Sequence, residues 1–296
     1  MRSINTDYYE IDDLLSVEHR LIRQTVRDFV LAEIKPFVNA AAQQQQELPQ
    51  LMLKLGTIGA LGPYIPTSYG GAGLDQMAYG LIMQELEAGD SAVRSAASVQ
   101  SSLVMFPIYT YGSELQKQQL LPGLAAGELI GSFGLTEPNQ GSDPAGMLTR
   151  LTADGDGYRL NGSKMWITNA PVCDIAVVWA KDDAGLVRGV VVHKDMEGFS
   201  RVETGNKWSL RASKTGELLF DNVYITETDI LPGVKSMRGP LSCLNSARYG
   251  ISWGVIGAAV DCYETAVSYA LEREQFGKPI AAFQLQQKKL AEMLTE

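Results

Sequence analysis

Apolar residues in the first third of the chain recur three and four positions apart, which is the spacing of a helix with one buried face. Ser16 lies directly before the first such stripe and predicts a helix N-cap. Further helices are predicted over residues 48–59, 77–87 and 96–109, and a short one starts at Ser113 and is interrupted by Pro122 and Gly123. Residues 63–75 are rich in proline and glycine and predict a loop, and glutamines 43–46 predict a solvated helix surface.

The pattern changes after Gly131 to short runs rich in β-branched residues. Asn161-Gly162 stands between two alternating runs and predicts a hairpin turn, with 164–169 as the second strand. Segments 175–180, 187–194 and 211–225 continue in the same style. After Pro240 a long apolar helical pattern returns. This order predicts an α+β multidomain protein: a helical domain over 1–130, a β-barrel domain over 131–238, and the first part of a helical bundle over 239–296.

The final predicted helix has Leu290, Met293 and Leu294 on one face and reaches Glu296 without a C-cap signal. A domain rarely ends inside a helix whose apolar stripe still needs cover, so we expect a larger bundle than these residues form. No GxGxxG sequence follows a predicted strand, which argues against a doubly wound nucleotide-binding domain.

Composition narrows the classes of partner. The net charge of -9 disfavours nucleic acid and anionic membranes. Cys173, Cys243 and Cys262 are odd in number and predict unpaired, buried thiols in a reducing compartment. With only His19 and His193 besides, we expect no metal site. Neither a secretory signal nor a bilayer-spanning apolar run is visible, so the predicted location is cytoplasmic.

Three segments carry candidate chemistry, and each also has a purely structural explanation. The loop 133–143 offers backbone N–H groups and hydroxyls to a polar heterocycle or a phosphate, or it is simply a turn between domains. Trp166 and Thr168 share one face of a strand and suit a flat ring, or they belong to a core. Glu87 and Arg94 are seven apart and face the same way if one helix contains both. Such an arginine can hold a carboxylate with two hydrogen bonds, or it forms a surface ion pair.

Taken together, FGLTEP with GSD, KMWITN, ARYG and REQFGKPI follow one another as they do in the acyl-CoA dehydrogenase family, which the chain resembles over nearly its whole length. Within that family, the segments around residues 94–114, 240–255 and 283–296 are most similar to glutaryl-CoA dehydrogenases. The resemblance implies a helical N-terminal domain, a β-barrel and a helical bundle, assembled as a homotetramer, with FAD between the barrel and the bundle.

The resemblance also implies the site residues. The expected cofactor-binding residues are Phe133, Gly134, Leu135, Thr136, Ser142, Trp166, Ile167, Thr168, Arg273, Phe276 and Gln284, the last three reaching FAD of a neighbouring subunit. The expected substrate-binding residues are Glu87, Arg94, Ser95, Ser142, Leu241, Leu244, Asn245 and Arg248. Among these, Arg94 and Ser95 match positions that hold the distal carboxylate of glutaryl-CoA, and Glu87 matches the acidic neighbour that orients the arginine.

The implied reaction is FAD-dependent α,β-dehydrogenation of glutaryl-CoA with decarboxylation to crotonyl-CoA, and transfer of the electrons to an electron-transfer flavoprotein. The family's catalytic glutamate is expected beyond Glu296, so no residue of the sequence is assigned as the base. Three alternatives stay open: a truncated homologue or fragment that binds acyl-CoA or FAD without turnover, a dehydrogenase for short or branched monocarboxylic acyl-CoA, and an acyl-CoA oxidase.

Overall fold

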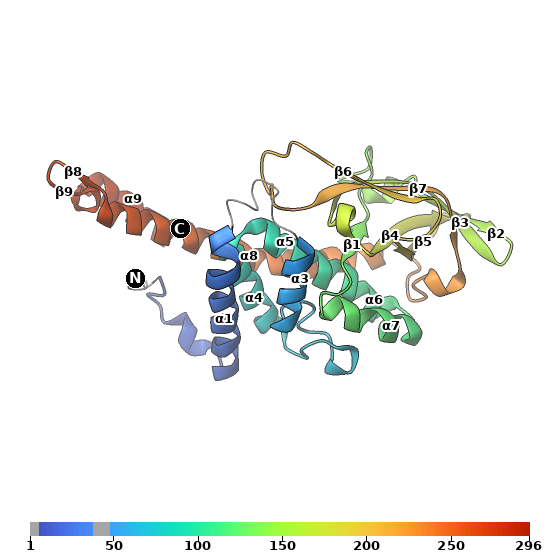
Figure 1. The fold of residues 1–296 in the computed structure, drawn as a ribbon, viewed down its shortest axis with the longest axis horizontal. Helices are drawn as coiled ribbons and strands as arrows, with labels where there is room; N and C mark the ends of the chain where they lie inside the picture. The colour runs from blue at the N-terminus through green and yellow to red at the C-terminus, as the bar shows by residue number, and fades with distance from the viewer. Residues whose placement is uncertain (1–5, 38–47) are drawn as a thin grey trace.

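The computed structural model describes residues 6–37 and 48–296, and the glutamine run 43–46 lies outside them. The N-terminal helices pack side by side in the body of the molecule (Figure 1). Their bounds are η1 Ile11–Leu14, α1 Val17–Phe29, η2 Val30–Ile34, η3 Lys35–Phe37, α3 Leu48–Thr57, η4 Thr67–Tyr69, α4 Gln76–Gly89, α5 Ser91–Ser98, η5 Val99–Met105, α6 Phe106–Tyr111 and α7 Glu114–Ala125. The predicted N-cap is confirmed, because the Ser16 side chain accepts a hydrogen bond of 3.1 Å from the backbone N–H of His19.

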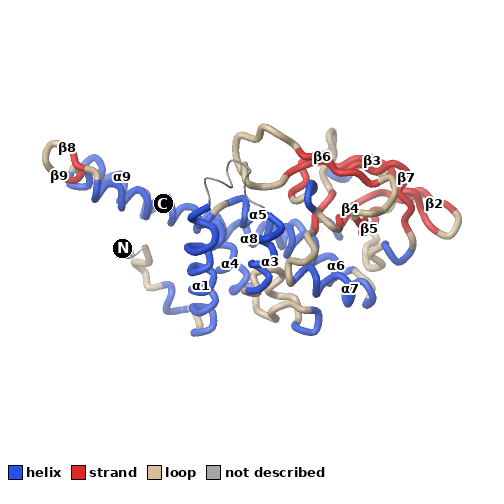
Figure 2. Tube along the Cα trace, in the orientation of Figure 1, coloured by secondary structure: helices blue, strands red, loops and turns tan. Residues whose placement is uncertain are grey.

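A seven-stranded sheet follows, and Figure 2 shows its strands together at one end of the molecule. Its strands are β1 Gly131–Gly134, β2 Arg150–Asp154, β3 Gly157–Thr168, β4 Ile175–Asp182, β5 Val187–His193, β6 Phe199–Glu203 and β7 Thr215–Ile225. The strand order is β1-β4-β2-β3-β7-β6, with β5 paired to β4. Short 3-10 turns, η6 Pro144–Gly146, η7 Ala170–Val172 and η8 Glu227–Asp229, lie in its connections.

The C-terminal part is dominated by α8 Arg238–Glu272, a helix of 35 residues. It packs along α4 and continues beyond the body of the molecule (Figure 1). The hairpin β8 Glu274–Gln275 and β9 Lys278–Pro279, the turn η9 Ile280–Ala282 and the helix α9 Gln284–Thr295 then fold back against α8. Helix α8 also carries exposed apolar residues, among them Val255, Ile256 and Tyr269.

Buried apolar residues form three clusters: one among the N-terminal helices, one within the sheet, and one where helices meet the sheet. Gln100, on the π-helical turn η5, joins the helices to β1. Its amide nitrogen donates to the carbonyls of Leu124 and Leu129 at 2.9 and 2.7 Å, and its oxygen accepts from Gly131 N–H at 2.8 Å. This fully buried side chain therefore satisfies three backbone groups at the junction.

The predicted α+β class is confirmed, but the Asn161-Gly162 hairpin is wrong. Strand β3 runs straight through these residues, with a register shift between Leu160 and Gly162, and the turn lies around Gly155 instead. Asn161 exchanges hydrogen bonds with Asn222 across the bulge at 2.9 and 3.1 Å. The glycine therefore serves a β-bulge, which uses the same residue types as a tight turn.

Two smaller predictions are also wrong. Helix α7 is not interrupted at Pro122 but continues to Ala125. Buried leucines on both sides of the proline hold this turn against the core. Cys173 and Cys243 are buried free thiols as predicted, whereas Cys262 is free but exposed on α8.

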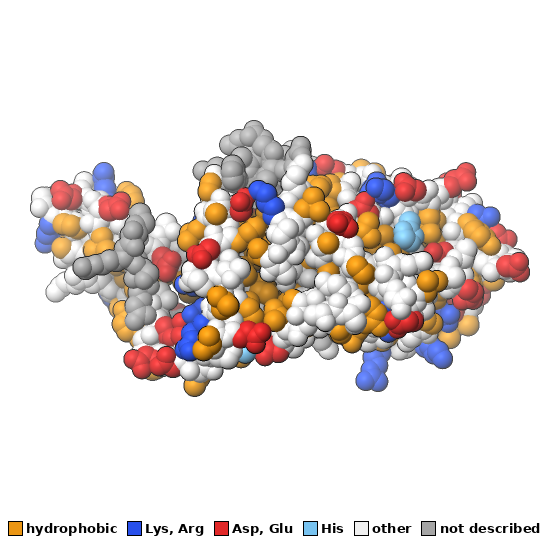
Figure 3. All heavy atoms as spheres, turned by 60° about the horizontal axis from the view of Figure 1, so that its bottom comes forward, with side chains coloured by type: hydrophobic (Ala, Val, Ile, Leu, Met, Phe, Trp, Pro, Cys, Tyr) orange, Lys and Arg blue, Asp and Glu red, His pale blue; other side chains and the backbone are white. Residues whose placement is uncertain are grey.

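The distribution of side chains on the surface and the character of the helices concern the predicted partners and location. On the face in Figure 3, acidic and basic side chains are intermixed, and apolar side chains lie between them. Among residues 6–37 and 48–296, no helix combines the length and apolar character needed to cross a bilayer.

Candidate active site

The apolar side chains at the end of β1 and the start of the following loop are buried, whereas its hydroxyl-bearing residues are more exposed. Phe133 is 8% exposed and packs edge-to-face on Trp179, with 5.9 Å between ring centroids, and Leu135 is buried too. Thr136 is half-buried, and its carbonyl accepts from Met165 N–H at 2.9 Å. Ser142 is exposed. The predicted contacts of Phe133 and Leu135 with a ligand would therefore come from the main chain.

A β-bulge in β3 turns Trp166 outward. The pairing with β7 shifts between Lys164 and Ile167, and Trp166 in between has a φ of 62°. This left-handed conformation is uncommon for a bulky residue and costs about 1–3 kcal/mol. The indole is 60% exposed while Ile167 is 3% exposed, and Thr168 is half-buried. The bulge thus presents an aromatic face and a hydroxyl together beside the loop that bonds Met165, an arrangement that fits a flat heterocycle.

A buried ion pair supports this loop from beneath. Lys164 Nζ lies 2.9 Å from Glu137 Oε1 and also donates to the Leu135 carbonyl at 3.1 Å. Glu137 further accepts from the backbone N–H of Leu148 and Thr149, at 2.6 and 3.0 Å, and from the Thr149 hydroxyl at 2.6 Å.

The environment shifts the pKa of both partners. Burial alone would raise the pKa of Glu137, but the hydrogen bonds from Thr149, Leu148 and Lys164 outweigh it and lower the pKa to about 2. Burial lowers the pKa of Lys164 to about 8, against the opposing effect of Glu137. At neutral pH the pair is ionised and both oxygens of Glu137 accept hydrogen bonds, so Glu137 is not a free base.

A second buried ion pair joins Arg94 and Glu87, so the explanation as a surface pair is wrong. The condition that one helix contains both residues is not met, because Asp90 has extended backbone, ends α4 and caps α5 by accepting from Ala92 N–H at 2.8 Å. The pair forms across this junction, between Arg94 Nε and Glu87 Oε2, with side chains 9% and 7% exposed. Ser91 donates its hydroxyl to the other oxygen of Glu87.

The guanidinium of Arg94 retains unused donors. Within the described residues, its two terminal nitrogens have no hydrogen-bond partner. Neither nitrogen is completely shielded from solvent. A largely buried arginine with two free donors is suited to bind an anion. Ser95, the next residue, is half-buried.

Helix α8 covers this region with residues from its first half. Leu244 packs against the junction core, whereas Leu241, Asn245 and Arg248 are exposed. Arg248 Nη1 donates to Asn245 Oδ1 at 2.8 Å. One turn further, Gly250 and Gly254 lie against side chains of α4 and α5.

The remaining predicted cofactor residues lie far from the bulge within one chain. Arg273, Phe276 and Gln284 are exposed at the end of α8 and on the hairpin and helix beyond it, and Phe276 is 94% exposed. Arg248 and Arg273 are 25 residues apart along a straight helix, which is roughly 40 Å. The structure does not bring these three residues to the same place as Trp166 and Thr168 (Figure 1).

Sequence reasoning missed a buried polar group beside Arg94. Tyr79 donates to or accepts from Ser102 at 2.6 Å and Ser98 at 3.4 Å, and it stacks on Tyr249 with 6.3 Å between ring centroids. Burial raises the pKa of the Tyr79 hydroxyl. Ser98 and Ser102 lie on and after α5, where the helix passes into the π-helical turn η5. The four-residue spacing of Ser98 and Ser102 places both on one helix face, and this was the signal in the sequence that could have indicated the polar group.

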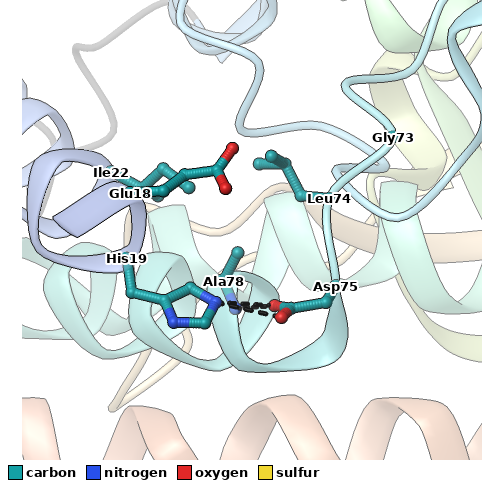
Figure 4. A pocket seen from close by; sticks show the side chains of 7 residues that line it. All are labelled: Glu18, His19, Ile22, Gly73, Leu74, Asp75 and Ala78. Atoms are coloured by element: carbon teal, nitrogen blue, oxygen red, sulfur yellow. Dashed lines mark hydrogen bonds and ion pairs between the residues drawn. The ribbon is translucent and has the colours of Figure 1, made fainter. Parts of the chain in front are cut away.

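A surface depression elsewhere contains none of the predicted residues. It lies between the start of α1 and the start of α4 and is lined by Glu18, His19, Ile22, Gly73, Leu74, Asp75 and Ala78 (Figure 4). His19 Nε2 is 3.0 Å from both carboxylate oxygens of Asp75, which also caps α4 through Ala78 N–H. These contacts fasten α1 to α4 and are structural.

Three domain families match the chain. The N-terminal helices match the acyl-CoA dehydrogenase N-terminal domain over residues 16–128, and the sheet matches the middle domain over 132–223. The long helix α8 and the residues after it match the C-terminal domain over 237–296. The chain therefore belongs to the acyl-CoA dehydrogenase family, a family of oxidoreductases.

Among solved structures, glutaryl-CoA dehydrogenase of Mycobacterium smegmatis is 50% identical, with a TM-score of 0.95, over 99% of this chain and 76% of that one. A second structure of that enzyme contains FADH2, the reduced form of the predicted cofactor. Among curated proteins, glutaryl-CoA dehydrogenase of Desulfococcus multivorans is 36% identical over 97% of this chain and 76% of its own length. Mitochondrial isovaleryl-CoA dehydrogenase of Pongo abelii is 35% identical over 95% and 69%. The predicted family and its flavin cofactor are confirmed, whereas these values do not separate one acyl-CoA from another.

Proposed function

We propose that this protein binds FAD and oxidises an acyl-CoA thioester between Cα and Cβ, with glutaryl-CoA as substrate. The observation that supports the substrate most directly is Arg94, which is buried, held by Glu87 and has two nitrogens without a partner in the described part of the chain. A dicarboxylyl thioester would supply the missing anion through its distal carboxylate. A simple acyl chain would displace water from these donors without replacing its hydrogen bonds, which is unfavourable.

The residues around the bulge fit FAD. Trp166 would pack against the flavin ring, and the hydroxyls of Thr136 and Thr168 and the main chain of residues 133–136 would bond its polar edge. When bound, FAD supplies the two-electron acceptor for the hydride that leaves Cβ. The ion pair Lys164–Glu137 fixes the loop in which these groups lie, which limits the reorganisation needed on binding.

The substrate would lie along the first half of α8, with Leu241, Leu244, Asn245 and Arg248 beside the thioester and Ser142 near the CoA portion. Its distal end would reach Arg94 and Ser95. The family resemblance assigns removal of the α-proton to a glutamate later than Glu296. Neither Glu87 nor Glu137 can replace it, because both carboxylates are already bonded to a buried cation and to hydroxyls.

Assembly into a homotetramer would complete the cofactor site. The exposure of Phe276 and the roughly 40 Å between Arg248 and Arg273 along α8 support a contact with FAD on a neighbouring subunit. Transfer of the electrons to an electron-transfer flavoprotein, decarboxylation to crotonyl-CoA and a cytoplasmic location are parts of the same proposal and rest on the resemblance.

A monocarboxylic substrate is the second candidate, because isovaleryl-CoA dehydrogenase is as similar as the curated glutaryl-CoA relative. The test is the visible spectrum of the purified protein during anaerobic titration with glutaryl-CoA, and separately with valeryl-CoA, which has a methyl group in place of the carboxylate. The proposal is supported if glutaryl-CoA bleaches the flavin band at a lower concentration than valeryl-CoA does. A perturbed but unbleached flavin would mean binding without turnover. Equal or better response to valeryl-CoA would favour the second candidate.

The matched variant is Arg94→Lys, which keeps the charge but loses the planar fork. We expect it to weaken binding of glutaryl-CoA by at least about 30-fold, corresponding to roughly 2 kcal/mol, and to change binding of valeryl-CoA little. An unchanged ratio between the two ligands would remove Arg94 from the assignment.

A further inference from the structure

Three glycines on α8, at positions 250, 254 and 257, lie on the face that packs against α4 and α5. They differ in what a side chain there would meet. A Cβ atom at Gly257 would lie 1.9 Å from the backbone oxygen of Gln84, so this glycine is required for the helices to approach. The three atoms nearest to a Cβ atom at Gly254 would all belong to two side chains.

Those side chains are the buried ion pair. The added Cβ would lie 3.0 Å from Glu87 Oε2, 3.4 Å from Arg94 Nε and 3.5 Å from Arg94 Cδ. Glu87 Oε2 is the atom that bonds Arg94, and the other oxygen is held by the Ser91 hydroxyl. The carboxylate of Glu87 is therefore held from two sides. If an added Cβ atom displaced this carboxylate by a few tenths of an ångström, the guanidinium bonded to it would have to move as well.

We infer that Gly254 is a positioning residue that sets selectivity for the distal end of the acyl chain. This inference deepens the proposed function and rests on it. The missing side chain leaves the ion pair in the orientation set by Glu87 and Ser91, with the two terminal nitrogens of Arg94 available to the carboxylate of a dicarboxylyl thioester. A side chain at this position turns the fork away while leaving its charge in place. Bidentate recognition depends on this orientation, since both hydrogen bonds must form at once.

The experiment compares wild type, Gly254→Ala, Gly254→Val and Gly257→Ala, each purified with its flavin. Isothermal titration calorimetry gives Kd for glutaryl-CoA and for valeryl-CoA, and thermal unfolding reports on the fold. For Gly254→Ala we expect the preference for glutaryl-CoA to fall about tenfold, corresponding to loss of one charge-assisted hydrogen bond, and for Gly254→Val to fall further. Both should unfold closer to wild type than Gly257→Ala, whose added atom meets backbone.

The outcomes separate the two assignments. If wild type binds both ligands equally, the proposed substrate is wrong and the role of Gly254 falls with it. If wild type prefers glutaryl-CoA and both Gly254 variants keep that preference, the substrate stands and the inference is overturned. If Gly254→Val does not fold, Gly254→Ala alone decides, because its contact is with movable side-chain atoms. A loss of preference in Gly257→Ala equal to that in Gly254→Ala would also overturn the inference, since helix spacing would then be the cause.

Discussion

Replacing Glu137 by glutamine should destabilise the protein in a pH-dependent way. The substitution keeps the shape but removes the charge, which leaves Lys164 buried beside a neutral amide. The pKa of Glu137 is lowered from 4.5 to about 2 in the folded protein. A shift of this size corresponds to roughly 3 kcal/mol of stability, at about 1.4 kcal/mol for each unit.

The sign of the pH dependence follows from the direction of the shift. A carboxylate with a depressed pKa stabilises the fold at pH above its unfolded value, and this contribution is lost as the pH falls towards the folded value. For Glu137 the window runs from about pH 4.5 down to about pH 2. The free-energy difference between wild type and Glu137→Gln should therefore be about 3 kcal/mol at pH 7 and about half of that at pH 3.

Urea unfolding of both proteins at pH 7, 5, 4 and 3, followed by circular dichroism, measures this difference. The matched control is Glu128→Gln, a change from the same residue type outside the buried pair, which should shift stability little. A difference below 1 kcal/mol at pH 7, or one that stays constant down to pH 3, would refute the account of the pair. The retained flavin should also decrease in Glu137→Gln, because the loop above loses its support.

Three further changes test other parts of the fold. Gln100→Ala removes three hydrogen bonds at the junction and should cost about 3 kcal/mol in urea unfolding, and a cost under 1 kcal/mol would contradict its role there. Trp166→Ala should lower the flavin-to-protein absorbance ratio of the purified protein while leaving the unfolding midpoint nearly unchanged, since the indole is 60% exposed. Gly162→Ala should destabilise by about 1–3 kcal/mol, since its φ is 142° and its Cβ would lie 2.6 Å from Thr149 Oγ1. Gly155→Ala, with a φ of 60° and open space around it, should cost less, and equal losses would rule out the contact with Thr149 as the cause.

Much of the fold could be predicted because helical and strand periodicity differ strongly between the parts of this chain. The prediction was wrong where one residue type serves two backbone geometries. Asn161-Gly162 is a favoured pair for a two-residue turn, but here cross-strand bonds to Asn222 hold the same pair in a bulge. The local sequence does not contain the position of the partner strand, which decides between the two.

The seven-residue spacing of Glu87 and Arg94 predicts that they face the same way only on one continuous helix, which the structure does not have. Asp90 breaks the helix, yet the two side chains still meet, because α5 starts at once and α8 closes over both. The sequence showed the two charges, but it did not show that the pair would be buried. Burial depends on the glycines of α8, more than 150 residues later in the chain.

Two buried ion pairs of similar composition therefore have different roles, and the difference lies in how completely their hydrogen-bonding groups are used. Lys164 and Glu137 are bonded to each other, to backbone groups and to Thr149, so every polar atom of this pair has a partner and the pair stabilises the loop. Among the described residues, Arg94 uses one of its nitrogens on Glu87 and leaves two without a partner. A ligand that pairs such donors is favoured, because donors in a largely buried place are costly to leave unpaired. The free nitrogens of Arg94, rather than the presence of an ion pair, are therefore what supports the proposed carboxylate site.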